Sequence, residues 1–419
     1  MLKKVLETIG TRYLVAFLNL LLIFVNGKVL GVEGMGLIGL IYASANIAMI
    51  FNSVLCGNTI VYFMNRNDFR YVFWPAYLWS FIGSAIACSI MGICNMLPHG
   101  FALEIYGLAV LLSLVTVHTR ILLGKDHIKG FNIVYILQGG LLFFILLCIY
   151  FLLGKKDAQA YVWGLFLTNG IAWVVSLILI LPYFHSTPFS APISTWKLIR
   201  EMFVYGLWSS ADNLAEGLTT RLNYFLLQRL GGYGLVGLLD AGTKISESVW
   251  HISRSVSFIS YSQTTKTKDP EIQRQMTLRF LKLTYCALIF VMSLVLLIPE
   301  WVYTDYLFTN EFRGIRPIII GLSVGIIALG CNGILSHYFI GTGRVKYSTA
   351  CSCIGLFVLF VVSHFLIPIY GVFGSAISTS IAFLSMFVFS LVVFIYLTKT
   401  PLRELLPTKD DFKRIKKAE

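Results

Sequence analysis

The chain has 419 residues, of which 57% are hydrophobic and only 13% are charged. This composition excludes soluble and disordered classes and is typical of helical proteins that cross a membrane many times. The formal net charge of +13 would suit a nucleic-acid partner, but most basic residues lie in short segments between apolar stretches. We therefore attribute the charge to membrane topology and to attraction for anionic lipid, and expect no nucleic-acid partner.

Twelve apolar stretches are each long enough to cross a hydrocarbon core of about 30 Å, which requires roughly 20 helical residues. They cover residues 11–30, 37–64, 71–96, 101–124, 131–153, 160–184, 203–230, 234–262, 277–299, 314–341, 345–367 and 371–397. The first is expected to remain as a span, because Asn19 and Asn26 interrupt it and no small-residue cleavage pattern ends it. The sequence therefore predicts an all-α polytopic membrane protein with 12 transmembrane helices.

The longest break between spans on the predicted inner side covers residues 185–202, where Pro188 and Pro192 favour extended backbone. It predicts an N-terminal six-helix lobe at 1–184, a cytoplasmic linker at 185–202, a C-terminal six-helix lobe at 203–397 and a basic cytoplasmic tail at 398–419. Similar glycine-rich segments, 30–40 and 230–238, recur at an offset of about 200 residues. Because six spans separate them, we expect two parallel lobes around a central cavity.

Charged residues form a ladder within the predicted eighth span. Its members are four, three, four and three residues apart: Asp240, Lys244, Glu247, His251 and Arg254. At roughly 100° per residue they project within an arc of about 80° on one helical face. The seventh span carries a similar polar face made of Asp212, Glu216, Thr219, Thr220 and Asn223. A charge at the bilayer centre costs at least about 2.5–3.5 kcal/mol, so both faces should turn toward each other or toward water.

Three sequence motifs carry a family resemblance. Residues 28–42 read KVLGVEGMGLIGLIY, residues 221–231 read RLNYFLLQRLG, and residues 367–377 read IPIYGVFGSAI. Together with the length and span count of the whole chain, they resemble the polysaccharide flippases of the multidrug/oligosaccharidyl-lipid/polysaccharide exporter superfamily. Two positions depart from that pattern: residues 257–263 lack a proline that is frequent there, and Asn223 stands where an acidic residue is frequent.

The resemblance implies two six-helix lobes around a central cavity and transport by alternating access. The implied cargo is an undecaprenyl-diphosphate-linked oligosaccharide repeat unit, moved from the inner to the outer leaflet for surface polysaccharide such as O-antigen or capsule. The implied location is the bacterial inner (plasma) membrane, with glycan polymerase and glycosyltransferase partners. We expect no enzymatic activity and no cofactor.

An anionic diphosphate cargo needs cationic groups that replace its hydration, and arginine can donate two hydrogen bonds to one phosphate. The candidate cargo-binding residues are Lys244, Arg254, His251, Arg221 and Arg120. The candidates for coupling to H⁺ or Na⁺ are Asp212, Glu216, Asp240 and Glu247, because a buried carboxylate can take up a proton in one conformation only.

Structural interpretations of the same residues stay open. Lys244 with Glu247, and Glu247 with His251, could neutralise one another in a closed core. Arg221 could snorkel to the interface, and Arg120 could be an interfacial anchor. Residue His118, near Arg120, would more often be a packing residue. The eight cysteines show no disulfide or metal spacing and are interpreted as small packing residues.

Two other functional classes compete with this interpretation. One is a cation-coupled drug or small-molecule exporter, or a lipid II flippase, of the same superfamily. The other is a membrane-bound glycan polymerase or acyltransferase. The cations Arg254, Lys244 and Arg120 favour an anionic cargo over a cationic one. The longest outer segment, residues 300–313, carries no paired-carboxylate or Ser–His arrangement, which argues against an enzyme.

The distribution of basic residues predicts that both termini are cytoplasmic. Of the 33 Lys and Arg residues, 23 lie in the segments assigned to the cytoplasm and six on the opposite side, an asymmetry that sets orientation by the positive-inside rule. A green fluorescent protein fused after Glu419 should therefore fluoresce, and an alkaline phosphatase fused there should be inactive. The same reporters inserted after Gly154 should give the reverse pattern. Phosphatase activity at Glu419 would contradict the topology.

Overall fold

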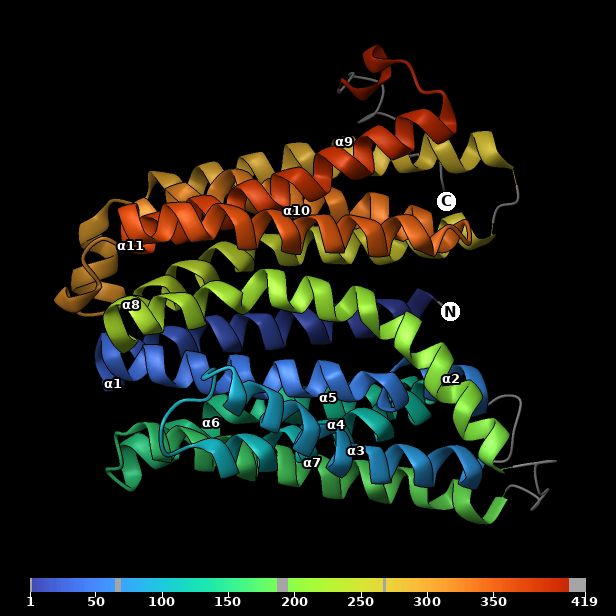
Figure 1. The fold of residues 1–419 in the computed structure, drawn as a ribbon, viewed down its shortest axis with the longest axis horizontal. Coiled ribbons are helices and arrows are strands. Elements are labelled where there is room, and N and C mark those ends of the chain that lie inside the picture. Colours follow the sequence, from blue (N-terminus) through green and yellow to red (C-terminus); the bar gives the residue numbers. More distant parts are fainter. Residues whose placement is uncertain (1, 65–68, 187–194, 267–268, 407–419) are drawn as a thin grey trace. The chain divides into compact units, whose positions relative to one another are not determined.

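The computed structural model describes residues 2–64, 69–186, 195–266 and 269–406, in which helices are the main secondary structure and no strand occurs (Figure 1). The predicted all-α membrane fold class is confirmed. Most of the predicted linker, at 187–194, and most of the basic tail, at 407–419, lie outside the described residues.

The helices follow the predicted spans closely, usually to within a few residues. In chain order they are α1 (Leu2–Cys56), α2 (Asn58–Met64), α3 (Phe69–Ile93), α4 (Ala102–Gly124), α5 (Ile128–Gly139), α6 (Leu141–Leu147), the π-helix η1 (Cys148–Leu152), α7 (Ala158–Ser186), α8 (Thr195–Lys266), α9 (Pro270–Leu297), the π-helix η2 (Val302–Leu307), the 3-10 helix η3 (Asn310–Phe312), α10 (Ile315–Gly341), α11 (Val345–Thr398) and the 3-10 helix η4 (Leu402–Leu405).

Eight helices in the described part of the chain are long and apolar enough to cross a membrane. Helix α8 is not among them, because its two polar stripes lower its hydrophobicity. Helices α1 and α11 each cover two of the predicted spans without an intervening loop. The total of twelve spans stays a prediction.

Glycines interrupt the three longest helices. Helix α1 breaks at Gly31 (φ 69°, ψ −175°) and α11 at Gly371 (φ 54°, ψ −128°). Helix α8 breaks at Gly231 and Gly232, and Gly232 has φ 75° and ψ −166°. The sequence predicts connecting segments of several residues at 31–36 and 231–233, and the structure instead needs one or two. A glycine can redirect the chain within one residue because it has no Cβ to oppose positive φ.

The two breaks at Gly31 and Gly232 support the predicted internal repeat. Gly31 comes one residue after Leu30 and Gly232 two residues after Leu230, and the φ and ψ angles of these two glycines differ by less than about 10°. The local backbone therefore agrees with the sequence similarity that first suggested the repeat.

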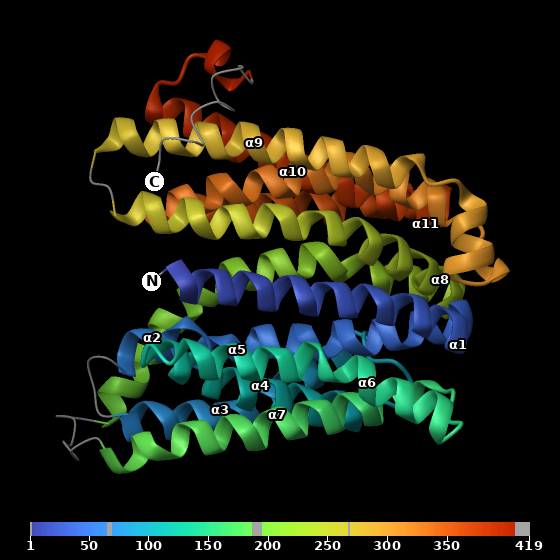
Figure 2. The same ribbon diagram turned by 180° about the vertical axis from the view of Figure 1, so that it is seen from behind.

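The chain divides into two compact units, Met1–Gly217 and Leu218–Glu419, and the division falls within α8. In unit 1, α4 packs against α1, α3 and α7, and α5 packs against α1 and α7 (Figure 2). In unit 2, α10 packs against both α9 and α11.

A buried asparagine joins the helices within each unit. In unit 1, Asn52 of α1 donates from Nδ2 to Ser84 Oγ at 2.7 Å and to Ser113 Oγ at 2.6 Å, which connects α1 with α3 and α4. In unit 2, Asn223 of α8 donates to the Ser375 carbonyl at 3.1 Å and accepts from Ser363 Oγ at 2.7 Å. Since Ser363 and Ser375 lie on opposite sides of the α11 break, Asn223 ties α8 to both parts of that helix.

Changing Gly232 to Ala tests the positive-φ break in α8. No atom lies within 4 Å of the position that the new Cβ would take, so the expected loss of about 1–3 kcal/mol comes from backbone conformation alone. Thermal unfolding in detergent measures the effect. The readout is a thiol dye that reacts with the buried Cys331 and Cys351 once unfolding exposes them. The matched control is Gly170→Ala, which also has open space but a helical backbone within α7. An equal loss of stability in both variants would contradict the assignment.

Candidate functional site

Five residues of α8 come together in unit 2 because the helix breaks at Gly231 and Gly232. They are Arg221 and Tyr224 before the break and Asp240, Lys244 and Glu247 after it. Arg221 and Glu247 are 26 residues apart in sequence, yet Arg221 Nη2 lies 3.1 Å from Glu247 Oε2. The break therefore brings together the polar faces of two segments of one helix.

The contacts form one continuous chain, which we call the α8 network. Arg221 Nη1 donates to the Tyr224 hydroxyl at 2.6 Å, and that hydroxyl donates to Asp240 Oδ1 at 3.1 Å. Lys244 Nζ lies 2.6 Å from the other carboxylate oxygen, Asp240 Oδ2. The network thus runs from Glu247 through Arg221, Tyr224 and Asp240 to Lys244.

The α8 network carries two carboxylates and two cations, so its formal charges cancel. Asp240 and Tyr224 are each only 1% exposed, whereas the side chains of Arg221, Lys244 and Glu247 are 20–22% exposed. An unpaired charge is costly to bury, and removing one partner of a buried pair is more harmful than removing both. The four charges therefore depend on one another, because removing one of them leaves its partner unpaired.

Two of the open interpretations are changed by these contacts. The pairing of Lys244 with Glu247 is wrong, because Lys244 binds Asp240 one turn earlier in the helix. Arg221, expected to contact cargo or to snorkel, is bound by Glu247 and Tyr224. Helical periodicity could not show this, because the Arg221–Glu247 pair joins two segments of a broken helix.

Arg254 differs from the other cations of the ladder. It is exposed, and its guanidinium carbon lies 4.3 Å from the centroid of the Trp250 ring, one turn earlier on α8. Among the described residues it has no ion pair with a carboxylate. Since the neighbouring network is neutral, Arg254 leaves this face of α8 with a surplus positive charge.

The remaining predicted site residues are placed as follows. His251 is half-buried on α8, and Arg120 is half-buried on α4 of unit 1. Asp212 and Glu216 are half-buried on α8, within the part that belongs to unit 1. Their roles in cargo binding or ion coupling stay predictions. In the part of the chain that the structure describes, no group of three or more His, Cys, Asp or Glu residues is arranged to hold a metal ion.

His118 is a fully buried packing residue in unit 1. Its Nε2 lies 2.5 Å from the Tyr77 hydroxyl and its Nδ1 lies 2.6 Å from Ser176 Oγ. Trp173 Nε1 donates to the Tyr77 hydroxyl at 3.2 Å, and Ser176 donates to the Trp173 carbonyl at 2.9 Å. A histidine that donates from Nδ1 and accepts at Nε2 satisfies every one of these contacts. The geometry therefore gives His118 a structural role between α3, α4 and α7.

Sequence reasoning did not single out Tyr224 or Trp250. Tyr224 lies three residues after Arg221 and Trp250 four residues before Arg254, and both spacings place side chains on one helix face. That spacing was the available signal. The role of Tyr224 as a bridge to Asp240 depends on the helix break.

Comparison with solved structures shows which fold this is. An inward-facing multidrug resistance MATE family transporter of the MOP superfamily superposes with a TM-score of 0.72 and 15% sequence identity, over 92% of this chain and 94% of that one. The lipid II flippase MurJ, in an inward closed conformation, superposes with a TM-score of 0.66 and 14% identity, over 97% of this chain and 89% of that one. The MATE multidrug transporter DinF-BH, in a complex with a ligand, gives 0.69 and 14%, over 97% and 96%. The chain therefore has the fold of MOP superfamily transporters.

The sequence comparisons are less informative. No family model matches the chain. An uncharacterized membrane protein of Methanocaldococcus jannaschii is 24% identical over 198 residues, which is 46% of this chain. The match spans 39% of that relative's length.

A double-mutant cycle tests the α8 network. Arg221→Gln and Glu247→Gln should each lower the free energy of unfolding by about 1–3 kcal/mol, because each leaves a charge without its partner. The double variant should recover much of that loss, giving a coupling energy of about 0.5–3 kcal/mol. Thermal unfolding in detergent measures all three. Arg313→Gln, at an exposed position between η3 and α10, is the control and should change stability by less than about 0.5 kcal/mol. Additive losses would rule out the pair.

Proposed function

We propose that the protein is a flippase for an anionic lipid-linked oligosaccharide, moving undecaprenyl-diphosphate-linked repeat units to the outer leaflet of the bacterial inner membrane for surface polysaccharide assembly. The observation that carries this proposal is the surplus positive charge of Arg254, which lies beside a neutral network on α8. The likeness of the fold to transporters supports transport over bond-forming chemistry.

The surroundings of Arg254 suit a phosphate ligand. The Trp250 ring at 4.3 Å covers one side of the guanidinium, and a cation over an aromatic ring keeps its N–H edges free to donate. Those edges form a planar fork that matches two phosphate oxygens. Trp250 also offers an aromatic surface near the same place, and sugar rings pack well against aromatic side chains.

The α8 network helps to separate this proposal from its rivals. A carrier of cationic drugs needs a free carboxylate, whereas Asp240 and Glu247 are already bound by Lys244 and Arg221. These two acids, with Asp212 and Glu216, remain our candidates for H⁺ or Na⁺ coupling. A lipid II flippase would also carry an anionic diphosphate, so Arg254 suits both flippase cargoes and only the sugar distinguishes them.

Arg254→Ala tests the proposal directly. Loss of a charge-assisted contact to phosphate costs about 1.5–3 kcal/mol, so leaflet transfer should fall roughly ten- to hundredfold. The assay uses proteoliposomes that contain a fluorescent polyprenyl-diphosphate oligosaccharide, with an impermeant quencher reporting the outer leaflet. Arg254→Lys should recover only part of the rate, because the ammonium keeps the charge and loses the fork.

The controls distinguish the rival functions. Arg313→Ala removes an exposed arginine elsewhere in unit 2 and should leave transfer unchanged. If Arg254 served only to neutralise Glu247, the double variant Arg254→Gln with Glu247→Gln would restore transfer, which the Arg221–Glu247 pair argues against. Transfer of a cationic dye that is unaffected by Arg254→Ala would favour a drug exporter. Formation of a glycosidic or ester bond would favour an enzyme.

A further inference from the structure

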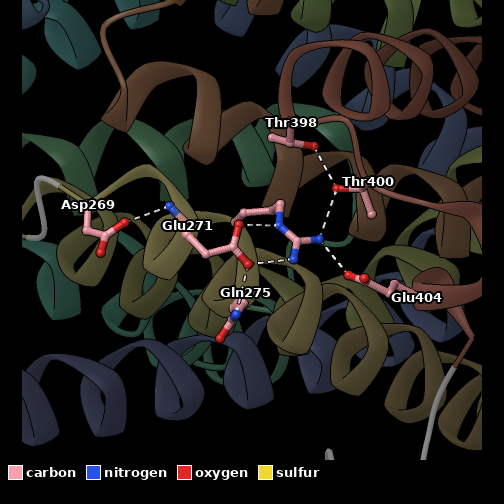
Figure 3. Close-up of polar contacts among 7 residues, drawn as sticks. Asp269, Glu271, Gln275, Thr398, Thr400 and Glu404 are labelled. Carbon is pink, nitrogen blue, oxygen red and sulfur yellow. Dashed lines mark hydrogen bonds and ion pairs between the residues drawn. The ribbon is translucent and has the colours of Figure 1, made fainter.

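A second cluster of charges in unit 2 lies where α9 begins and the chain leaves α11. Arg274 of α9 donates from Nε to Glu271 Oε2 at 2.8 Å and from Nη2 to Glu271 Oε1 at 2.6 Å, a bidentate pair. Its remaining nitrogen, Nη1, donates to Glu404 Oε2 at 2.5 Å and to Thr400 Oγ1 at 3.5 Å. Figure 3 shows Glu271, Thr400 and Glu404 on these contacts. We call this cluster the Arg274 clasp.

The α9 side of the clasp is held by bonds within its own helix. Asp269 caps α9 by accepting from the backbone N–H of Glu271 at 2.8 Å, and Gln275 Nε2 donates to Glu271 Oε1 at 2.8 Å (Figure 3). Glu271 in turn orients the guanidinium of Arg274 through its bidentate pair. None of these bonds involves Glu404, so the first turn of α9 is a preformed socket for a carboxylate.

Residues 399–406, which we call the strap, reach this socket from the end of α11. Lys399 takes left-handed angles (φ 53°, ψ 34°) that end the helix, and Pro401 cannot continue it. Helix η4 then lies against α9 and brings Glu404 to Arg274. The chain therefore turns sharply after α11 and returns to the start of α9.

Apolar packing contributes little to the attachment of η4. None of its residues, all of which the structure describes, is buried; Leu405 is half-buried and Leu402 is 71% exposed. Hydrophobic stabilisation grows with the apolar area removed from water, so it is small here. The Arg274 side chain, in contrast, is only 13% exposed and that of Glu404 45%. The strap is therefore held chiefly by the contacts that Arg274 makes with Glu404 and Thr400.

We propose that the strap is a releasable latch, which the Arg274–Glu404 ion pair fastens to α9 and which opens when that pair is broken, while the socket stays folded. A segment held by charge and not by packing can open locally without unfolding the helices around it. Ion pairs with an exposed partner are individually weak, and salt screens them, so the open fraction should grow with ionic strength. The proposal uses neither Arg254 nor the α8 network, so it stands or falls separately from the transport function.

Hydrogen exchange on the full-length protein in phosphatidylcholine nanodiscs tests the latch. The backbone N–H groups of Glu404 and Leu406 donate to the carbonyls of Pro401 and Arg403, so peptides from 399–406 report whether the strap is in place. Raising sodium chloride from about 0.01 M to about 1 M shortens the Debye length from about 30 Å to about 3 Å. Exchange at 399–406 should then become at least about twofold faster. Exchange that does not change with salt would overturn the proposal.

Glu404→Gln removes the ion pair and keeps the shape of the side chain. Peptides from 399–406 should exchange at least about threefold faster at low salt, and the salt dependence should disappear. Arg403→Gln is the matched control, because Arg403 is the neighbouring residue of η4, is exposed and has no ion pair among the described residues. It should exchange like the wild type. Equal exchange in the wild type and Glu404→Gln, or an equal increase in Arg403→Gln, would contradict the latch.

Peptides from the start of α9 show which side of the clasp moves. Peptides from 270–276 should keep the wild-type exchange rate in Glu404→Gln, because Asp269 and Arg274 still hold Glu271. Faster exchange at 270–276 would mean that the strap holds α9 in place, and it would overturn the assignment of the strap as the moving part.

Glu404→Lys reverses the sign of the electrostatic interaction. Two cations then face each other across the clasp, so exchange at 399–406 should be faster than in Glu404→Gln at low salt. Because salt screens repulsion as well as attraction, raising the salt concentration should now slow the exchange. Exchange that instead rises with salt, as in the wild type, would show that the response does not come from the pair with Arg274, and would overturn the proposal.

Discussion

The hydrocarbon core of a membrane offers no water to polar groups, so partners within the protein are what stabilise a polar side chain that is buried there. Much of this structure follows from that constraint. Asn52 in unit 1 and Asn223 in unit 2 each connect several helices through serine hydroxyl or carbonyl groups. The ring of contacts around His118 does the same between α3, α4 and α7. Polar residues that cost energy singly become the groups that hold the helices together.

The same constraint gives Arg254 its significance. Four charges of α8 cancel within one network. This network is possible because the break at Gly231 and Gly232 turns two polar faces of the helix toward each other. Arg254 remains outside that balance and rests on Trp250. Among the described residues Arg254 has no carboxylate partner, and a cation without such a partner is expensive to keep within a membrane. An anionic ligand would compensate it, and for this reason we connect the arginine with cargo rather than with stability.

The two charged clusters of unit 2 use arginine differently. In the α8 network, Arg221 joins two parts of one helix through Glu247 and Tyr224. At the start of α9, Arg274 binds the carboxylates of Glu271, on its own helix, and Glu404, in the segment after α11, and both acids are labelled in Figure 3. Both exploit several donors on one planar group.

The sequence by itself determined the all-α membrane fold and nearly all helix positions, because runs of about 20 apolar residues have few other solutions. It also located the charged ladder, since helical periodicity is visible in residue spacing. Only the tertiary structure decided which charges meet. Arg221 and Glu247 are brought together by Gly232, whose positive φ redirects α8, and Lys244 binds Asp240 instead of Glu247 within the same ladder. Spacing along one helix cannot specify a contact that depends on how the chain folds back. Arg254 could therefore be recognised as the cation outside the network only after the pairs Arg221–Glu247 and Lys244–Asp240 were known.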